Sequence, residues 1–271
     1  MREIFYKNNF LWFVSIMVVV FSVVYQRVTG PTYPVRGKIT VNNETIPFKL
    51  LRSENVGTPL SIVLETENAE LSGEVVYKRY KSFDPWTTQA MSRQGNRLIA
   101  NLPPQPPAGK LIYKVFLIQD GKRISLTGED TVIARYKGRV PNWVLIPHVI
   151  AMFLSMLLAV RAGLETVKQI PNLKPWIFWT ISMLFIGGFI LGPLTQKFAF
   201  GEFWTGIPFG HDLTDNKALI AMLAWLWAWY RNRGEVVNKR AVVLAAVVMM
   251  VVYLIPHSVL GSEIDYTQMP K

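Results

Sequence analysis

Histidine is the residue in this chain best suited to chemistry, and the chain contains three of them: His148, His211 and His257. Cysteine is absent, which excludes thiolate chemistry and cysteine-ligated metals. Two of the histidines end the same tetrapeptide, Leu-Ile-Pro-His, at 145–148 and 254–257. The first copy opens an apolar segment and the second closes another, so antiparallel helices would bring both imidazoles to one interface. We interpret this interface as the face of the protein that carries its site.

Three interpretations of the histidines stay open. In the first, His148 and His257 are the axial ligands of one b-type haem, and Gly188 leaves room for the porphyrin. In the second, a divalent metal or a proton binds to nitrogen and oxygen donors, namely His211, Asp212, Asp215, His257 and Glu263. In the third, the histidines form interfacial hydrogen bonds, while Asp212 and Asp215 cap the start of a helix.

The elements that must position these residues are long uncharged segments, which indicate an integral membrane protein. They run over 10–25, 143–160, 175–194, 218–230 and 241–256. We expect the first to be an uncleaved signal anchor, because Pro31 hinders signal peptidase and no Ala-x-Ala pattern is present. The fourth is short for a bilayer core of about 30 Å, so we expect that helix to begin near Leu213.

The basic residues of the short connections predict the orientation, because lysine and arginine are retained on the cytoplasmic side. If the spans alternate, one side receives Arg2, Lys7, Arg161, Lys168, Lys174, Arg231, Arg233, Lys239 and Arg240. The N-terminus is then cytoplasmic, and the segment 31–140 and the C-terminal tail are extracytoplasmic. This layout predicts a protein of the bacterial inner membrane with all three histidines near its outer face.

The exported segment reads as β structure throughout. Strand-forming residues recur at 35–41, 46–51, 61–64, 74–80, 86–91, 97–102, 110–118 and 131–136, with turn signals at Asn42-Asn43 and Asp120-Gly121. About eight strands predict one two-sheet sandwich. The predicted fold is therefore a membrane α-helical protein, with one signal-anchor helix (1–30) and a four-helix bundle (141–271), and an inserted immunoglobulin or fibronectin III-like sandwich (31–140).

Two segments of the exported domain bear on its type. A proline-rich stretch at 103–107 followed by a strand containing Tyr113 resembles the tyrosine corner of such sandwiches. The stretch 78–86 alternates basic and aromatic residues in a pattern that binds sugars or anionic polymers. We favour a structural role for this stretch, in which Trp86 is the buried core aromatic and the charges form a solvated face.

Three segments, at 109–113, 209–217 and 255–266, resemble uncharacterised bacterial membrane proteins with an exported immunoglobulin-like domain, a resemblance that implies this layout and no activity. The net charge of +11 is dispersed, and with an exported location it argues against nucleic acid as a partner. The common hydrolase, nucleotide and metalloprotease motifs are absent from the sequence. We therefore expect a non-enzymatic binding or accessory subunit whose partners are the lipid bilayer and another membrane or periplasmic protein. The alternatives are a b-type electron carrier and a metal or pH-responsive site.

Overall fold

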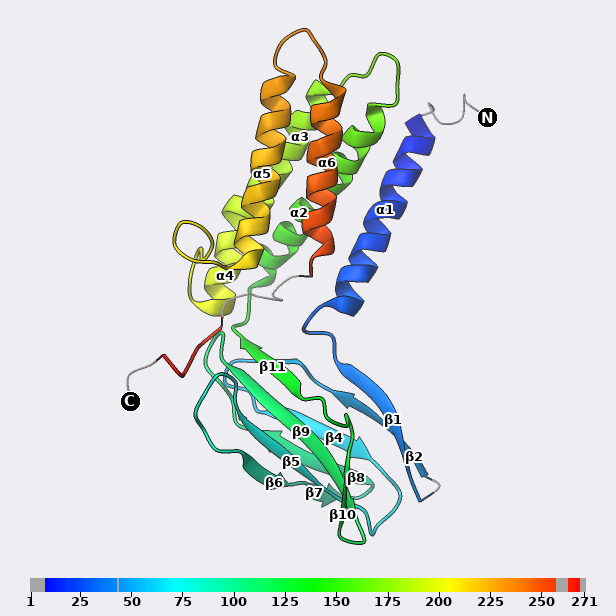
Figure 1. Ribbon diagram of the computed structural model, residues 1–271, viewed down its shortest axis with the longest axis vertical. Coiled ribbons are helices and arrows are strands. Elements are labelled where there is room, and N and C mark those ends of the chain that lie inside the picture. The colour runs from blue at the N-terminus through cyan, green and yellow to red at the C-terminus, as the bar shows by residue number, and fades with distance from the viewer. Residues whose placement is uncertain (1–7, 43, 257–262, 269–271) are drawn as a thin grey trace. The chain divides into compact units, whose positions relative to one another are not determined.

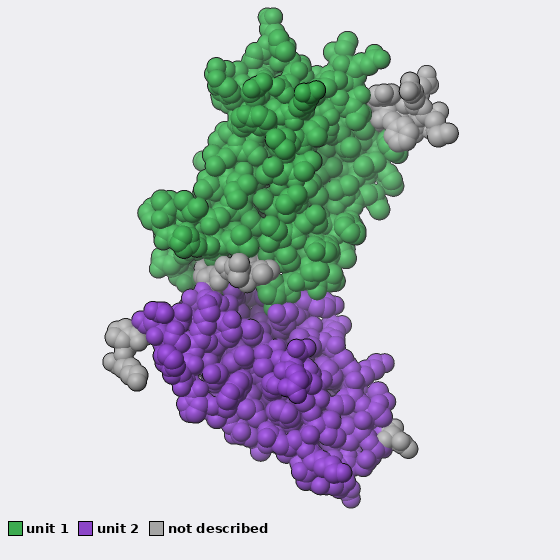
Figure 2. All heavy atoms as spheres, viewed as in Figure 1, with its two compact units in different colours: residues 1–31, 140–261 green, residues 32–139, 262–271 purple. Residues whose placement is uncertain are grey.

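The computed structural model describes residues 8–42, 44–256 and 263–268, and it divides into two compact units (Figure 1). Figure 2 colours these units separately. The helical unit comprises Met1–Pro31 and Val140–Gly261. The β unit comprises Thr32–Arg139 and Ser262–Lys271, so the C-terminal tail clusters with the strands rather than with the helices.

The helical unit contains long apolar helices joined by short polar connections. Its elements are α1 (Asn8–Thr29), α2 (Asn142–Glu165), α3 (Lys174–Phe185), the π-helix η2 (Ile186–Leu191), α4 (Gly192–Phe200), α5 (Leu213–Arg231) and α6 (Lys239–Leu254). Helix α5 begins at Leu213, as predicted, because Asp212 is its N-cap and accepts a hydrogen bond from the Thr214 amide. Small residues such as Ala159, Ala221 and Ala245 let the helices approach closely around the buried Trp225.

Three helices within the described residues are long and apolar enough to cross a membrane. They are Asn8–Thr29, Asn142–Glu165 and Lys174–Phe200, the last of which runs through α3, η2 and α4. Helix α6 has 16 residues, or about 24 Å at 1.5 Å per residue, which is less than the bilayer core. The composition of these helices is that of a membrane protein.

The strands form three sheets. A two-stranded sheet pairs β1 (Val35–Val41) with β2 (Glu44–Leu50). A six-stranded sheet has the order β3 (Ser53–Asn55), β11 (Val132–Lys137), β9 (Lys110–Gln119), β5 (Ser72–Arg79) and β6 (Thr87–Ala90), with β10 (Lys122–Ser125) also paired to β9. A three-stranded sheet has the order β4 (Leu60–Glu65), β8 (Arg97–Leu102) and β7 (Ser92–Gln94).

The predicted fold class is wrong. The chain is 43% helical and 25% strand, so it is a mixed α and β protein rather than a helical bundle that carries one sandwich. Every predicted strand segment falls on an observed strand, but β3, β7 and β10 were not predicted, and the strands divide among three sheets. The helical unit also departs from a regular four-helix bundle, because η2 interrupts the helix between α3 and α4.

Pro47 explains one division between sheets. The turn after Val41 makes Val41 and Glu44 a hydrogen-bonded pair, so Pro47 belongs to a non-hydrogen-bonded pair with Lys38. The backbone nitrogen of Pro47 therefore points away from β1 and toward β4. Because proline has no amide hydrogen, it cannot donate a hydrogen bond there. No backbone hydrogen bond joins β2 to β4 among the residues that the structure describes. Pro47 thus removes one donor that a continuous sheet across β2 and β4 would use, and the two strands lie in separate sheets.

Two buried tyrosines hold the connections of the β unit. The Tyr113 hydroxyl donates to the Leu51 carbonyl at 2.7 Å, and the Tyr136 hydroxyl donates to the Pro103 carbonyl at 3.1 Å. Burial raises the pKa of both phenols, to about 12 for Tyr136. The expected tyrosine corner is wrong, because Tyr113 bonds a segment 62 residues away rather than the chain just before its own strand.

Candidate functional site

His148 lies on α2 against the π-helix. Its Nδ1 atom is 2.9 Å from the Gly187 carbonyl oxygen, which also accepts from the Gly192 amide. Because a carbonyl can only accept, Nδ1 carries the proton and Nε2 is left as an acceptor or ligand. A π-turn of this kind is often found at functional positions.

The space expected beside the glycines is filled by helix packing. A Cβ on Gly187 would lie 2.8 Å from Met152 Sδ, so α2 and η2 are already in close contact. A Cβ on Gly188 would meet Ala218, Leu184 and Met152 at ordinary van der Waals distances. The neighbouring cavity has a volume of about 20 Å³, which is room for one water molecule.

His257, the second ligand in the haem interpretation, lies outside the described residues. The haem therefore stays a prediction. For the metal interpretation, no group of three or more histidine, aspartate or glutamate side chains within the described residues is placed to hold an ion. The exposed side chain of His211 lies just before the N-cap of α5.

The two aspartates expected as helix caps stabilise the loop before α5. Asp212 is the N-cap of α5. Asp215 is buried, and its Oδ2 atom accepts from the backbone amides of Thr205 at 2.6 Å and Gly206 at 3.0 Å. Asn216 accepts from the Ile207 amide at 2.8 Å. These side chains fold the 201–212 loop onto the start of α5, so the capping interpretation is confirmed for Asp212, and Asp215 instead binds amides of the loop.

Lys217 is a buried cation that the hydropathy pattern did not reveal. It is 5% exposed, and its ammonium donates to the Ile255 carbonyl at 2.8 Å just beyond the end of α6. It also lines the small cavity with Met152 and Tyr253. Helix C-termini attract cations through their free carbonyls, so Lys217 joins the start of α5 to the end of α6. A lysine directly before an apolar segment is the sequence signal for such a contact.

Arg161 holds a second polar cluster within the helical unit. It is 1% exposed, pairs with Glu165 at 2.6 Å, and lies over the Trp176 ring at 4.7 Å and the Trp12 ring at 5.7 Å. Its Nη2 atom also donates to Asn8 Oδ1 at 3.2 Å. The charge of Arg161 is therefore paired inside the helical unit, among α1, α2 and α3, and does not reach lipid phosphates.

The loop between β5 and β6 presents two exposed aromatic side chains. Phe83 is 80% exposed and Trp86 is 46% exposed, so the expected role of Trp86 as the buried core aromatic is wrong. The core of the β unit is instead built from aliphatic residues around Tyr113 and Tyr136. Lys78 lies over the Trp86 ring at 5.4 Å. Large exposed aromatics close together are typical of binding surfaces.

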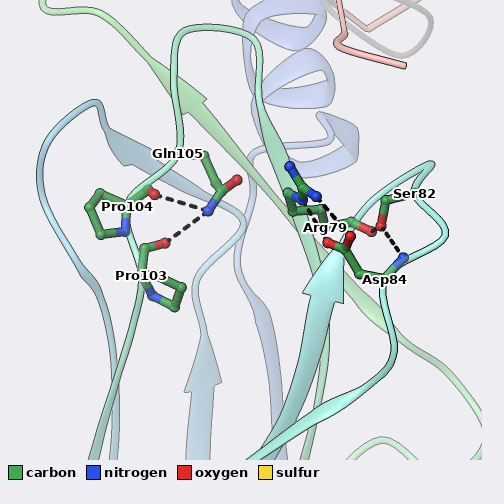
Figure 3. A network of polar contacts seen from close by, with 6 residues as sticks. All are labelled: Arg79, Ser82, Asp84, Pro103, Pro104 and Gln105. Carbon is green, nitrogen blue, oxygen red and sulfur yellow. Dashed lines mark hydrogen bonds and ion pairs between the residues drawn. The ribbon is translucent and has the colours of Figure 1, made fainter. Parts of the chain in front are cut away.

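This loop is held by ion pairing (Figure 3). Arg79 donates to both oxygens of Asp84, with Nε to Oδ2 at 2.6 Å and Nη2 to Oδ1 at 2.7 Å. The hydrogen bond from Arg79 holds the pKa of the Asp84 carboxyl below its usual range. Ser82 donates to the Arg79 carbonyl at 2.8 Å and closes the turn. In the neighbouring proline-rich loop, Gln105 donates to the Pro104 carbonyl at 2.9 Å.

The C-terminal tail packs on the same end of the β unit. The Glu263 carboxylate forms ion pairs with Lys81 and Lys110, and Arg79 lies 4.4 Å over the Tyr266 ring. Burial raises the pKa of Glu263, but hydrogen bonds from the two lysines outweigh it and hold that pKa below its usual range. Burial lowers the pKa of Lys110. Glu263, expected as a metal ligand, is therefore engaged by two ammonium groups.

The arrangement as a whole is suited to binding. In the helical unit the polar groups join helices, and in the β unit a braced loop displays two aromatic rings beside paired charges.

Comparisons with known proteins identify neither a family nor a function for this chain. No family model matches the chain, and no curated protein matches it. One solved structure, the Br derivative of BhCBM56, is similar over 36% of this chain and 97% of its own, with 12% identity and a TM-score of 0.26. A TM-score this low carries no argument about fold or function.

Proposed function

We propose that this protein is a non-enzymatic binding or accessory subunit of the bacterial inner membrane, and that its β unit binds a partner protein on the extracytoplasmic side. The observation that carries this proposal is the braced loop that exposes Phe83 and Trp86. Aromatic side chains contribute strongly to protein interfaces because they bury a large area with few rotatable bonds. The Arg79–Asp84 pair keeps the loop ordered before binding, which lowers the entropic cost of association.

The helical unit serves in this proposal as the membrane anchor, with the N-terminus in the cytoplasm. Contacts at both ends of α1 support its retention as an uncleaved anchor. Asn8 accepts hydrogen bonds from Arg161 and Lys168, and Gln26 donates to the Tyr253 carbonyl. A helix with polar contacts to its neighbours at both ends is part of the folded unit.

Site-specific photo-crosslinking in cells that make the protein tests the binding role. A benzophenone side chain placed at Phe83 or Trp86 is expected to form a discrete adduct with another protein. The matched control is Lys122, which lies in the β9–β10 hairpin at the opposite end of β9 from Lys110. Equal adducts from position 122, or none from 83 and 86, would contradict the proposal.

A further inference from the structure

A groove lined by β1, β2 and β4 is a second candidate binding site. It is separate from the loop between β5 and β6 that exposes Phe83 and Trp86. Its volume is about 530 Å³, which is in the range of small-molecule sites. It is lined by Arg36 of β1, Pro47, Phe48 and Lys49 of β2, Leu51, and Ser61, Val63 and Glu65 of β4. The groove follows the line along which β2 and β4 are not joined by backbone hydrogen bonds.

Two like charges face each other at this groove. Arg36 lies directly across from Lys49, and the register of the hairpin makes them a non-hydrogen-bonded pair, in which side chains are closest. Within the described residues neither forms an ion pair with an acidic side chain. Arg36 lies 5.7 Å over the Tyr33 ring, and stacking of this kind leaves the edge of the guanidinium available.

Like charges directly opposite each other destabilise an antiparallel pair. The other cross-strand pairs on the exposed face of the hairpin carry no charge or one charge: Thr40 lies opposite Thr45, and Lys38 lies opposite Pro47. Arg36 opposite Lys49 is the pair with two like charges. A bound anion would remove the repulsion and accept hydrogen bonds from both cations.

The rest of the groove defines what the anion is attached to. Glu44 at the start of β2 accepts from Thr66 Oγ1 just after β4, at 3.0 Å and 2.9 Å for its two oxygens, so β2 and β4 run antiparallel. This alignment places Lys49 near Ser61, and Pro47 near Val63. The middle of the groove is therefore apolar, with Val63 38% exposed. Glu65 at the far end is paired with Arg97 at 3.0 Å, so among the described residues the unpaired charges of the groove are the cations at its other end.

From this pattern we infer that the groove binds a small amphipathic carboxylate, whose charged group lies between Arg36 and Lys49 and whose apolar body lies over Pro47 and Val63. This inference does not depend on the loop between β5 and β6 or on the function proposed for it. The ligand is a small molecule rather than an extended peptide, because Pro47 removes a main-chain donor that strand addition would use.

Calorimetric titration of the full-length protein in phosphatidylcholine nanodiscs tests the inference. The probe is N-acetylphenylalanine, and its carboxamide is the uncharged control. We expect saturable binding of the acid, at least about tenfold weaker binding of the amide, and a similar loss in the Arg36→Gln/Lys49→Gln variant. Lys38→Gln, on the same strand but outside the groove, is expected to leave binding unchanged.

The unfolding temperature of the double variant distinguishes a loss of binding from a loss of folding. The double variant is expected to unfold at the same or a higher temperature, because it relieves the repulsion, so its loss of binding cannot be a loss of fold. Val63→Trp is expected to block the acid by filling the groove. The inference is overturned if the amide binds as tightly as the acid, if the double variant retains binding, if Val63→Trp has no effect, or if an acidic hexapeptide binds more than about tenfold tighter than the acid.

Discussion

The Nδ1 atom of His148 lies 2.9 Å from the carbonyl oxygen of Gly187, so a side chain of α2 is bonded directly to the π-helix. Nitrogen NMR is expected to show His148 with a protonated Nδ1 and an unprotonated Nε2. His148→Asn, whose amide can donate to the same carbonyl, is expected to be more stable than His148→Ala. A protonated Nε2 with a bare Nδ1 would contradict the assignment.

Gly187→Ala is expected to lower the unfolding temperature in detergent, with a loss of about 1 to 3 kcal/mol. The added methyl group would lie 2.8 Å from Met152 Sδ and 3.1 Å from the Met152 amide nitrogen, so α2 and η2 would have to separate. Gly188→Ala is the matched control, because its nearest contact would be 3.6 Å. Equal losses in the two variants would be evidence against this packing.

Arg161→Ala is expected to destabilise the helical unit by about 1 to 3 kcal/mol, because the buried Glu165 then keeps only its ion pair with Lys168, at 2.9 Å. Arg161→Leu combined with Glu165→Leu is expected to recover part of that loss, since it removes both buried charges. Thermal unfolding in detergent measures both. If the double variant were no more stable than Arg161→Ala, the ion pair would not explain the effect.

Acidification is expected to weaken the loop that carries Phe83. Because Arg79 lowers the pKa of Asp84 in the folded protein, the folded state binds fewer protons, and the pair stabilises the fold above the ordinary aspartate pKa of about 3.9. That stabilisation is lost as the pH falls below this value through the lowered pKa. Both side chains are partly exposed, so the effect is expected to stay under about 1 kcal/mol.

The measurement compares the unfolding of the native chain and Asp84→Asn between pH 6 and pH 3. The variant is expected to lose less stability than the native chain over this interval, and Asp130→Asn, in an exposed turn, is expected to follow the native chain. Identical pH profiles for the native chain and Asp84→Asn would show that the pair contributes nothing.

Cysteine labelling in intact cells tests the proposed orientation, because the chain has no cysteine of its own. Lys122→Cys in the β unit is expected to react with a membrane-impermeant maleimide. Gly234→Cys, in the connection between α5 and α6, is expected to react only after the cells are opened. The reverse pattern would invert the proposed topology.

The sequence predicted local structure well where one short segment decides it. Alternation of apolar and polar residues located the main strands, and Asp120-Gly121 forms the expected hairpin turn with both residues at positive φ. The same alternation could not reveal that Pro47 separates two sheets, because the effect depends on which edge of β2 faces β4. Strand periodicity alone does not determine how strands are shared among sheets.

The candidate sites were harder to predict for a related reason. From its residue type, Trp86 was predicted to lie in the core. Aliphatic side chains around Tyr113 fill that space instead, and the Trp86 indole is exposed. Lys217 sits at the start of an apolar segment, and only the end of α6 beside it explains how its charge is accommodated. Glu263 lies far along the chain from Lys81 and Lys110, so no local pattern joins the three residues.

Pro47 also affects how readily a second copy of the chain can add to the edge of β2. An unpaired strand edge is a template on which a second copy of the same chain can add and begin to aggregate. A proline in the middle of that edge leaves a gap in the row of donors, so an added strand would bind poorly. The donor that Pro47 lacks at the edge of β2 in the folded β unit is therefore also lacking for a strand of a second copy.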